Sequence, residues 1–413
     1  MKKRSVIVVG GGASGLTAAI FAARAGANVT VIEHMDRVGK KILSTGNGRC
    51  NLTNRVMNGD CYRCGRKDFP MEVIGRFDVG QTLDFFKGLG ILPKDRQGYI
   101  YPNSDQASSV LDVLRLEAEH LNITFMLNCE AERIKKLRDG EFQVKTPQGP
   151  VKGGAVILAA GSKAAPVTGS DGSGYRLAEE LGHRVVKPLP ALVQLCCKGR
   201  FFKLLSGVRS DVRLSLFIDG KQAAADSGEL QLTDYGISGI PTFQVSRYAS
   251  IALDKKRKVE AVIDFLPSLT ETELKRELER RSRDMGYRSC GDLMTGMLNK
   301  KLASVLLKEA GIEPSSPASG LSGRSRQALL EGIKQFTVEV TAARPFENAQ
   351  VCCGGVDVNE VDSTTMESRI VKGLYLCGEI LDVDGICGGY NLQFAWSSGA
   401  IAGTSAGGME NIR

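Results

Sequence analysis

A glycine-rich turn near the start of the chain has the spacing of a nucleotide-binding motif. Three glycines form the pattern G-x-G-x-x-G directly after an apolar run. Such glycines make a tight turn, let the backbone approach a pyrophosphate, and let a helix pack on a sheet. Glu33 closes the next apolar run, where a carboxylate accepts hydrogen bonds from the ribose hydroxyls of adenosine. The pattern predicts a dinucleotide site at Glu33 and at Gly10, Gly12, Ala13, Ser14 and Gly15.

The far end of the chain distinguishes FAD from NAD, which share this motif. The segment 373–379 resembles the second FAD motif of glutathione-reductase-like flavoproteins, in which a strand ends in Gly-Asp and the acid contacts the ribitol. Glu379 replaces that Asp here. The segment after it opens a helix whose N-terminal amides would face the flavin pyrimidine, where negative charge accumulates on reduction. We therefore expect FAD to contact Gly378, Glu379, Gly389, Tyr390, Asn391 and Leu392.

A loop rich in Gly, Asn, Ser and Thr covers residues 39–54. Because it follows Glu33, we expect it to run along the flavin, with cationic side chains countering cofactor charge and glycines admitting backbone amides. A solvated basic loop is the alternative. The remaining cofactor contacts that we expect are in this loop, directly after Glu33, or at the end of the strand predicted at 155–159. They are His34, Lys41, Thr45, Gly46, Gly48, Arg49, Cys50, Asn51 and Gly161.

Other reactive side chains give weaker signals. Cys61 and Cys64 have the spacing of a redox pair or half a zinc site, but no second pair follows at zinc-finger distance, so we expect no metal. The three histidines, at positions 34, 120 and 183, are scattered, and no Ser or Cys motif accompanies them to suggest a catalytic triad. Tyr235 and Tyr390 are chemically possible proton donors. The sequence identifies no catalytic residue.

The hydrophobic pattern indicates the elements that carry these residues. A strand at 5–9, a helix at 13–25 and a strand at 28–33 form a βαβ unit. A helix at 110–121 and strands at 123–127, 141–145 and 155–159 follow. After His183 the pattern changes to an all-β module, with strands at 191–197, 212–218 and 259–265 and a hairpin turn at Asp219-Gly220.

Helical patterns interrupt this module. A capping box beginning at Ser268 or at Thr270 opens a charged helix that runs to residue 283. Further helices are predicted at 291–310 and 324–336. Strand character returns at 338–341 and at 373–379, and a last helix covers 390–403.

Composition indicates an ordinary globular protein. The chain has 413 residues, of which 42% are hydrophobic and 24% charged, so neither a disulfide-stapled miniprotein nor a disordered chain is expected. The 11 cysteines form no regular framework, and the apolar run near the start is too short for a signal peptide. No stretch is long enough to span a membrane. We expect a cytoplasmic protein without a membrane or nucleic-acid partner, although its net charge of +8 suits anionic ligands.

Taken together, these segments resemble the BaiN/YhiN-like flavoproteins, also called aminoacetone-oxidase-related. The resemblance covers nearly the whole chain and rests on the N-terminal unit and on residues 44–54, 233–239, 365–368 and 378–398. It implies an α/β fold in which a glutathione-reductase-type FAD-binding Rossmann domain is interrupted by a β-barrel insert with a small helical subdomain. The implied boundaries are 1–190 and 346–413 for the FAD domain, 191–345 for the insert, 191–267 and 337–345 for its barrel, and 268–336 for its helices.

The resemblance also implies a range of activities. The preferred expectation is NAD(P)H-dependent reduction of a C=C bond in an enone, such as a 3-oxo bile-acid intermediate. NAD(P)H would bind only transiently, because the chain has no second G-x-G-x-x-G unit. The substrate would be an anionic or apolar carbonyl compound. One alternative is an FAD-dependent oxidase of a small primary amine that uses O2. A third alternative comes from the residues and not from the resemblance: a non-catalytic flavin-bearing protein that binds RNA through the basic run at 255–258.

Overall fold

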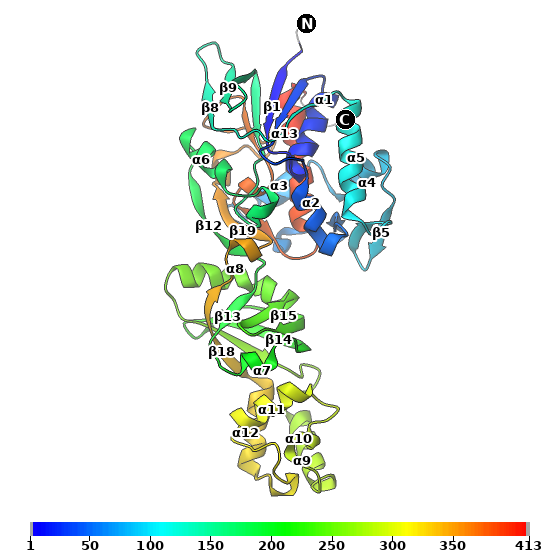
Figure 1. Ribbon diagram of the computed structural model, residues 1–413, viewed down its shortest axis with the longest axis vertical. Coiled ribbons are helices and arrows are strands. Elements are labelled where there is room, and N and C mark those ends of the chain that lie inside the picture. Colours follow the sequence, from blue (N-terminus) through cyan, green and yellow to red (C-terminus); the bar gives the residue numbers. More distant parts are fainter. Residues whose placement is uncertain (1–2, 410–413) are drawn as a thin grey trace. The chain divides into compact units, whose positions relative to one another are not determined.

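The computed structural model describes residues 3–409, which form two compact units (Figure 1). The first unit combines the chain up to Leu189 with the chain from Gln350 onward, and the second spans Pro190–Ala349. The chain returns from the second unit to the first between Ala349 and Gln350, slightly later than the 345/346 boundary expected from the sequence.

A parallel sheet forms the core of the first unit. Its strand order is β20-β11-β1-β2-β7, and β1 pairs in parallel with both β11 and β2. The strands are β20 (Leu374–Leu376), β11 (Ala155–Leu158), β1 (Ser5–Val9), β2 (Asn28–Ile32) and β7 (Thr124–Met126). The central strands are apolar at nearly every position because both faces of a parallel sheet are covered.

Two helices pack against this sheet and against each other, α1 (Ala13–Arg24) and α13 (Tyr390–Gly407). Glycines on α13 allow the close approach: a Cβ at Gly399 would lie 2.5 Å from the Ser14 carbonyl oxygen, and one at Gly403 would overlap the Ala18 carbonyl oxygen. Because it is surrounded by other elements, α13 is buried along most of its length. Even so, no helix in residues 3–409 combines the length and the apolar character that crossing a membrane would require.

The remaining elements of the first unit surround this core. They are α2 (Lys40–Ser44), β3 (Thr53–Asn54), β4 (Tyr62–Cys64), α3 (Phe69–Ile74), α4 (Val79–Gly88), β5 (Pro93–Arg96), β6 (Tyr99–Pro102), α5 (Ala107–His120), β8 (Arg133–Lys136), β9 (Phe142–Lys145), β10 (Val151–Gly153), α6 (Ser173–Glu180), β12 (Val185–Ala191, whose last residues cross into the second unit), β19 (Val351–Val356) and β21 (Val383–Gly385). Short 3-10 helices are η1 (Thr45–Gly48), η2 (Gly59–Cys61), η3 (Pro166–Thr168), η6 (Val358–Glu360) and η7 (Gly378–Ile380).

The second unit is built on a closed barrel with the strand order β13-β16-β15-β14-β17-β18. Its strands are β13 (Leu195–Cys197), β14 (Arg209–Ile218), β15 (Lys221–Leu232), β16 (Gly236–Gly239), β17 (Val259–Asp264) and β18 (Phe336–Ala343). Alternate residues point inward along β14 and β17, as their burial shows, so the barrel has its own apolar core. The hairpin between β14 and β15 turns at Asp219 (φ 49°) and Gly220 (φ 77°), as the sequence predicted.

Helices complete the second unit. They are α7 (Phe202–Leu205), α8 (Ile240–Asp254), α9 (Glu271–Asp284), α10 (Cys290–Leu293), α11 (Lys300–Glu309) and α12 (Gly323–Lys334), with 3-10 turns η4 (Ala318–Gly320) and η5 (Phe346–Asn348). Of the two capping boxes predicted for α9, the structure forms the one at Thr270, whose side chain accepts from the backbone of Glu273. This unit and the Rossmann-type first unit confirm the predicted fold class.

Three local predictions were wrong. The segment 39–54 is not simply a loop, because it contains α2 and η1. The single helix predicted at 291–310 is two helices, since the Asn299 side chain caps a new helix by accepting from the Lys301 amide. The module after His183 is not all-β, because it includes α8. A signal for α8 was present in the buried residues Val245, Ala249 and Ala252, whose spacing is helical.

Candidate functional site

The glycine turn joins β1 to α1 and leaves the start of α1 open. Gly10 has a φ of 102°, and a Cβ there would lie 2.5 Å from the carbonyl oxygen of Ala159. A Cβ at Gly15 would overlap the carbonyl oxygen of Gly10. Gly12 differs from both, because its φ is −79° and a Cβ there would meet no atom within 4 Å. The fold itself therefore requires Gly10 and Gly15, whereas Gly12 borders open space.

Glu33 lies beside this turn, directly after β2. Its Oε2 accepts from the Gly11 amide at 2.8 Å, and its Oε1 accepts from the Met35 amide at 2.8 Å. The residue is only 9% exposed. A carboxylate has about four acceptor positions, so these two bonds orient it and leave acceptor capacity for a ligand.

The loop after β11 lies next to the residue that follows Glu33. The Nε2 atom of His34 would be 3.4 Å from a Cβ placed on Gly169, so His34 packs beside this loop. Gly161 has a φ of 72°, and a Cβ there would lie 3.1 Å from the Ser170 hydroxyl. The structure thus brings His34 near the loop that Gly161 opens.

The segment between α2 and β3 folds tightly on itself. The Thr45 hydroxyl donates to the Ile42 carbonyl at 2.6 Å, and the Cys50 amide donates to the Thr45 carbonyl at 3.0 Å. Gly46, Gly48 and Cys50 all have positive φ, at 56°, 81° and 58°. Left-handed backbone at several nearby positions makes a compact loop, which is easy for glycine and unusual for the cysteine.

The last residues of this loop have different surroundings. Cys50 is completely buried, and burial raises the pKa of its thiol to about 12, so it stays protonated. Arg49 is exposed. The Asn51 amide is best oriented with its oxygen accepting from the Gly389 amide at 3.3 Å and its nitrogen donating to the carbonyl of Ile100 at 3.1 Å. Asn51 therefore links the loop to the start of α13.

A polar cluster joins α2 to the turn after β20. The Lys41 Nζ lies 2.6 Å from the Glu379 Oε2 and donates to the Ala164 carbonyl at 3.3 Å. The Ser162 hydroxyl donates to the same carboxylate oxygen at 3.1 Å. Gly378, with a φ of 76°, donates its amide to the Ser398 hydroxyl of α13 at 3.0 Å. Ser162 is a member of this cluster that no sequence pattern identified.

The start of α13 is held in place by one of the predicted residues. The Oδ1 of Asn391 accepts from the Gly385 amide at 2.8 Å, and its Nδ2 donates to the Gly385 carbonyl at 2.9 Å. Gly389 caps the helix with a φ of 92°, and Leu392 is half-buried. The side chain of Asn391 thus fastens α13 to β21, so it orients the helix.

Both helix starts fit a dinucleotide cofactor. Among the residues that the structure describes, no side chain caps α1 or α13, and neither helix has an acidic residue in its first turn. The unpaired amides at the N-terminus of a helix, together with its dipole, favour negative charge. The open space in front of Gly12 suits a pyrophosphate, and the oriented carboxylate of Glu33 suits a ribose. The second positive helix end, at Gly389, suits a ring that accepts electrons.

One predicted proton donor lies at this helix start. The Tyr62 hydroxyl donates to the backbone carbonyl of Tyr390 at 2.8 Å, and the two rings meet edge to face at 6.0 Å. Burial raises the pKa of Tyr390, and the neighbouring Cys61 raises it further. Its phenol therefore stays protonated, and the raised pKa makes it a weaker acid than an ordinary phenol. The other candidate, Tyr235, is in the second unit, in the turn between β15 and β16.

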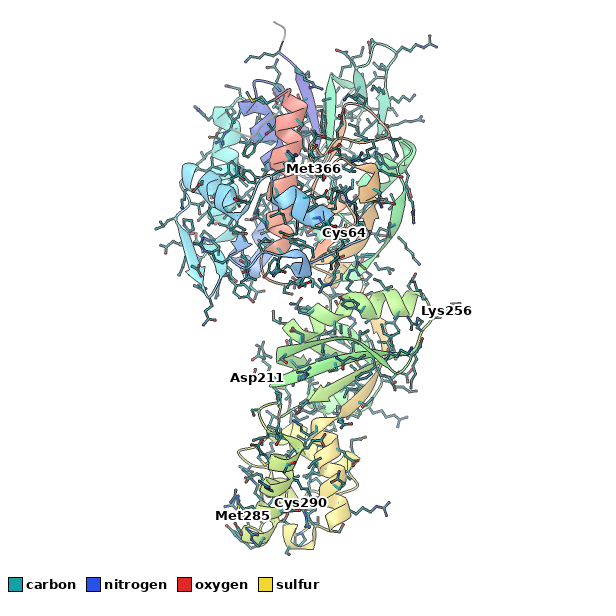
Figure 2. The ribbon with its side chains drawn as sticks, turned by 180° about the vertical axis from the view of Figure 1, so that it is seen from behind. Cys64, Asp211, Lys256, Met285, Cys290 and Met366 are labelled. Carbon is teal, nitrogen blue, oxygen red and sulfur yellow. The ribbon has the colours of Figure 1, made fainter. Side chains whose placement is uncertain are left out.

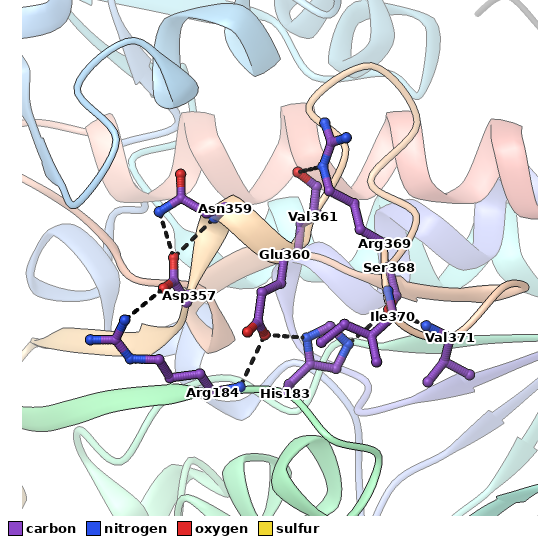
Figure 3. Close-up of polar contacts among 10 residues, drawn as sticks. All are labelled: His183, Arg184, Asp357, Asn359, Glu360, Val361, Ser368, Arg369, Ile370 and Val371. Atoms are coloured by element: carbon purple, nitrogen blue, oxygen red, sulfur yellow. Dashed lines mark hydrogen bonds and ion pairs between the residues drawn. The ribbon is translucent and has the colours of Figure 1, made fainter.

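A cluster of Ser368, His183 and Glu360 went unnoticed in the sequence (Figure 3). The Nδ1 of His183 lies 3.0 Å from the Glu360 Oε2, and its Nε2 lies 2.8 Å from the Ser368 Oγ. The order of contacts resembles that of a hydrolase triad, but the histidine side chain is 0% exposed. The Ser368 hydroxyl also accepts from the amides of Ile370 and Val371. These bonds tie segments together, and no sequence pattern predicts them.

The cysteines show no sign of a metal site or disulfide. All 11 lie within residues 3–409, and no disulfide joins any of them. Cys64, labelled in Figure 2, is on β4, and burial raises its pKa to about 12. Within residues 3–409, no three His, Cys, Asp or Glu side chains are grouped so that they could hold a metal ion.

Comparisons with known proteins match nearly the whole chain. The family model for the HI0933-like protein Rossmann domain matches residues 4–405. A 3-dehydro-bile acid delta(4,6)-reductase of Clostridium scindens is 43% identical over 401 residues, which cover 97% of this chain and 98% of that protein. A ribosomal RNA dihydrouridine synthase of Escherichia coli is 30% identical over 400 residues, which cover 96% of each chain.

Among solved structures, the open conformation of a flavocytochrome c3 fumarate reductase is 17% identical with a TM-score of 0.49, covering 98% of this chain and 78% of that chain.

Proposed function

Because the chain belongs to the HI0933-like Rossmann family, we propose that it is an FAD-dependent oxidoreductase that reduces a C=C bond conjugated to a carbonyl. The observation that carries the proposal is the 43% identity, over nearly the full length of both chains, to a reductase named for a 3-dehydro bile acid. In such a substrate the ketone withdraws electrons through the double bond, so its β-carbon accepts a hydride.

FAD would supply the hydride chemistry, and the residues of the first unit would bind and orient it. The open N-terminus of α1 would hold the pyrophosphate, and Glu33 would accept from the adenosine ribose. Lys41 pairs with Glu379 beside the place where the ribityl chain would pass. The N-terminus of α13, fixed by Asn391, would stabilise negative charge at the pyrimidine end of the ring.

NAD(P)H is the proposed electron donor. The chain contains one G-x-G-x-x-G turn, which is assigned to FAD, so the nicotinamide would bind openly and leave after transfer. Reduction adds one hydride to the β-carbon and one proton to the α-carbon. Tyr390 and Tyr235 are the phenols proposed to give that proton.

Anaerobic mixing of the FAD-loaded protein with NADH or NADPH tests this proposal. We expect the yellow flavin absorbance to disappear and to return when a 3-oxo steroid enone is added, with the saturated ketone as product. A contrary result would be flavin that stays oxidised with both nucleotides, yet bleaches with a small primary amine and recovers in air with release of peroxide. That result would replace the reductase with the amine oxidase.

A second candidate substrate is uracil in RNA. It is favoured by the 30% identity to a ribosomal RNA dihydrouridine synthase, because the ring double bond of uracil is also conjugated to a carbonyl. The basic run at 255–258 offers limited support. In it Arg257 pairs with Asp219 and Lys258 pairs with Glu260, while Lys256, labelled in Figure 2, is exposed. Supplying ribosomal RNA and a steroid enone to the same reduced enzyme, and measuring both products, separates the two substrates.

A further inference from the structure

Three polar residues gather at one end of the barrel in the second unit. Gln194 directly precedes β13, Arg344 directly follows β18, and Tyr235 lies in the turn before β16. β13 pairs with both β16 and β18, which brings these three positions together although they are far apart in the sequence. The Arg344 amide donates to the Gln194 carbonyl at 2.9 Å, and the Cys197 amide of β13 donates to the Tyr235 carbonyl at 2.9 Å.

Tyr235 supports the guanidinium of Arg344. The Cζ of Arg344 lies 4.8 Å from the centre of the Tyr235 ring, which is the distance of a cation–π contact. Two hydrogen bonds hold the turn that carries the ring. The Thr233 amide donates to the Gly236 carbonyl at 2.9 Å, and the Thr233 hydroxyl donates to the same carbonyl at 3.1 Å. A guanidinium is planar and carries its N–H donors along its edge, so holding it in place fixes the directions in which it can donate.

The cluster contains polar atoms without partners. The Nε of Arg344 and the Oε1 of Gln194 are buried, and neither has a hydrogen-bond partner among the described residues 3–409. In residues 3–409, no carboxylate forms an ion pair with Arg344, although the second unit contains many such pairs on its surface. Buried polar atoms are almost always hydrogen-bonded, so an unpaired donor and an unpaired acceptor on two residues that are joined through their backbones are unusual.

We propose that Gln194, Tyr235 and Arg344 form a substrate-binding site for a negatively polarised oxygen. Arg344 would donate to the oxygen, Gln194 would accept from a hydroxyl on the same ligand, and Tyr235 holds the arginine in position. A hydroxylated steroid with a carboxylate tail carries both groups, and so does one with a ketone in place of the carboxylate. The inference rests on the proposed function for the identity of the ligand, but binding can be measured without turnover.

The test compares binding of three probes to the FAD-loaded full-length chain. The probes are cholate, its methyl ester, and a neutral hydroxylated steroid enone, and binding is measured by equilibrium dialysis. The variants are Arg344→Gln and Arg344→Lys, with Arg213→Gln as a control that removes one exposed positive charge from β14 of the same unit. Circular dichroism and the melting temperature establish that each variant is folded.

We expect Arg344→Gln to bind one of the probes about 10- to 100-fold more weakly than the wild type, because the variant loses a charge-assisted hydrogen bond. Weaker binding of cholate but not of its methyl ester by Arg344→Gln identifies the carboxylate as the source of the bound oxygen. Weaker binding of the neutral enone identifies the ketone. Arg344→Lys should recover part of the affinity because it keeps the charge, and Arg213→Gln should bind like the wild type.

The inference is wrong if Arg344→Gln binds all three probes as the wild type does, because the unpaired atoms then hold water only. It is also wrong if the wild type binds none of the three. Failure of the proposed function has a different signature, namely a wild type that binds cholate or the enone through Arg344 but never reduces an enone when supplied with NAD(P)H.

Discussion

At the residue scale, the three glycines of the first turn have different physical roles. Gly10 and Gly15 are fixed by the fold, since a side chain at either would meet backbone atoms. Gly12 is not, because a side chain there would extend into open space before α1. The structure therefore separates a residue needed for folding from one whose smallness serves only a ligand, a distinction that the shared motif conceals.

Replacing these glycines should give opposite results. Gly12→Val should fold with a stability loss of at most about 1 kcal/mol, the cost of a poorer helix cap, but should be purified without flavin. Gly15→Val should be destabilised by about 3 kcal/mol or more, because the side chain forces α1 away from the turn. Melting temperature and flavin absorbance measure both effects. A yellow, fully loaded Gly12→Val protein would contradict the assignment of the pyrophosphate to this turn.

At the element scale, the start of α13 is positioned by contacts outside the helix. Asn391 binds both backbone groups of Gly385 on β21, and Asn51 contacts the Gly389 amide. Farther along, the close packing of Gly399 and Gly403 against α1 sets the distance between the two helices. One helix end proposed to face the flavin is thus fixed relative to the other, which is proposed to face the pyrophosphate.

Asn391→Ala should loosen this arrangement without unfolding the protein. It removes two neutral hydrogen bonds, worth about 1 to 3 kcal/mol together, and frees the backbone of Gly385. We expect FAD to bind about tenfold or more weakly to the apoprotein, as measured by fluorescence titration. Asn28→Ala, which removes an exposed asparagine at the start of β2, is the matched control. Equal FAD affinity in both variants would mean that Asn391 does not orient the cofactor site.

At the scale of the whole molecule, the first unit must join two stretches of chain that the second unit separates. His183 comes before the crossing into the second unit, and Glu360 and Ser368 come after the return. Glu360 also accepts from the Arg184 amide at 3.0 Å. The cluster therefore fastens the two halves of the first unit to each other.

The stability of this junction should depend on pH. Burial lowers the pKa of His183 below its usual 6.5, so the unfolded chain binds a proton more readily than the folded one. Stability is then fully present above about pH 6.5 and is lost as the pH falls below that value. Urea unfolding at pH values above and below about 6.5 should show that the free energy of unfolding of the wild type falls as the pH falls. The free energy of unfolding of His183→Gln should depend less on pH. His120→Gln, at an exposed histidine, should behave like the wild type.

Features that depend on neighbouring residues could be predicted from the sequence. The βαβ unit, the Asp219-Gly220 hairpin and the Thr270 capping box are local, because a few adjacent residues set the backbone angles and supply the hydrogen bonds. The family resemblance added the barrel and the helical subdomain, and both are present. Local patterns failed at two places. The helix α8 lies in a region that was predicted to be strands, and the single helix predicted at 291–310 is two helices, with a break before α11.

Contacts between residues that are far apart in the sequence could not be predicted, because they form only when the whole fold assembles. Lys41 pairs with Glu379 across 338 positions, and His183 contacts Ser368 across 185 positions. Gln194 and Arg344 become neighbours because both flank strands that pair in the barrel. None of these pairs has a local signal, since neither partner affects the backbone of the other until the strands between them have assembled. The cofactor turn could therefore be found from residue spacing, whereas the barrel-end cluster depends on strand pairing across the second unit.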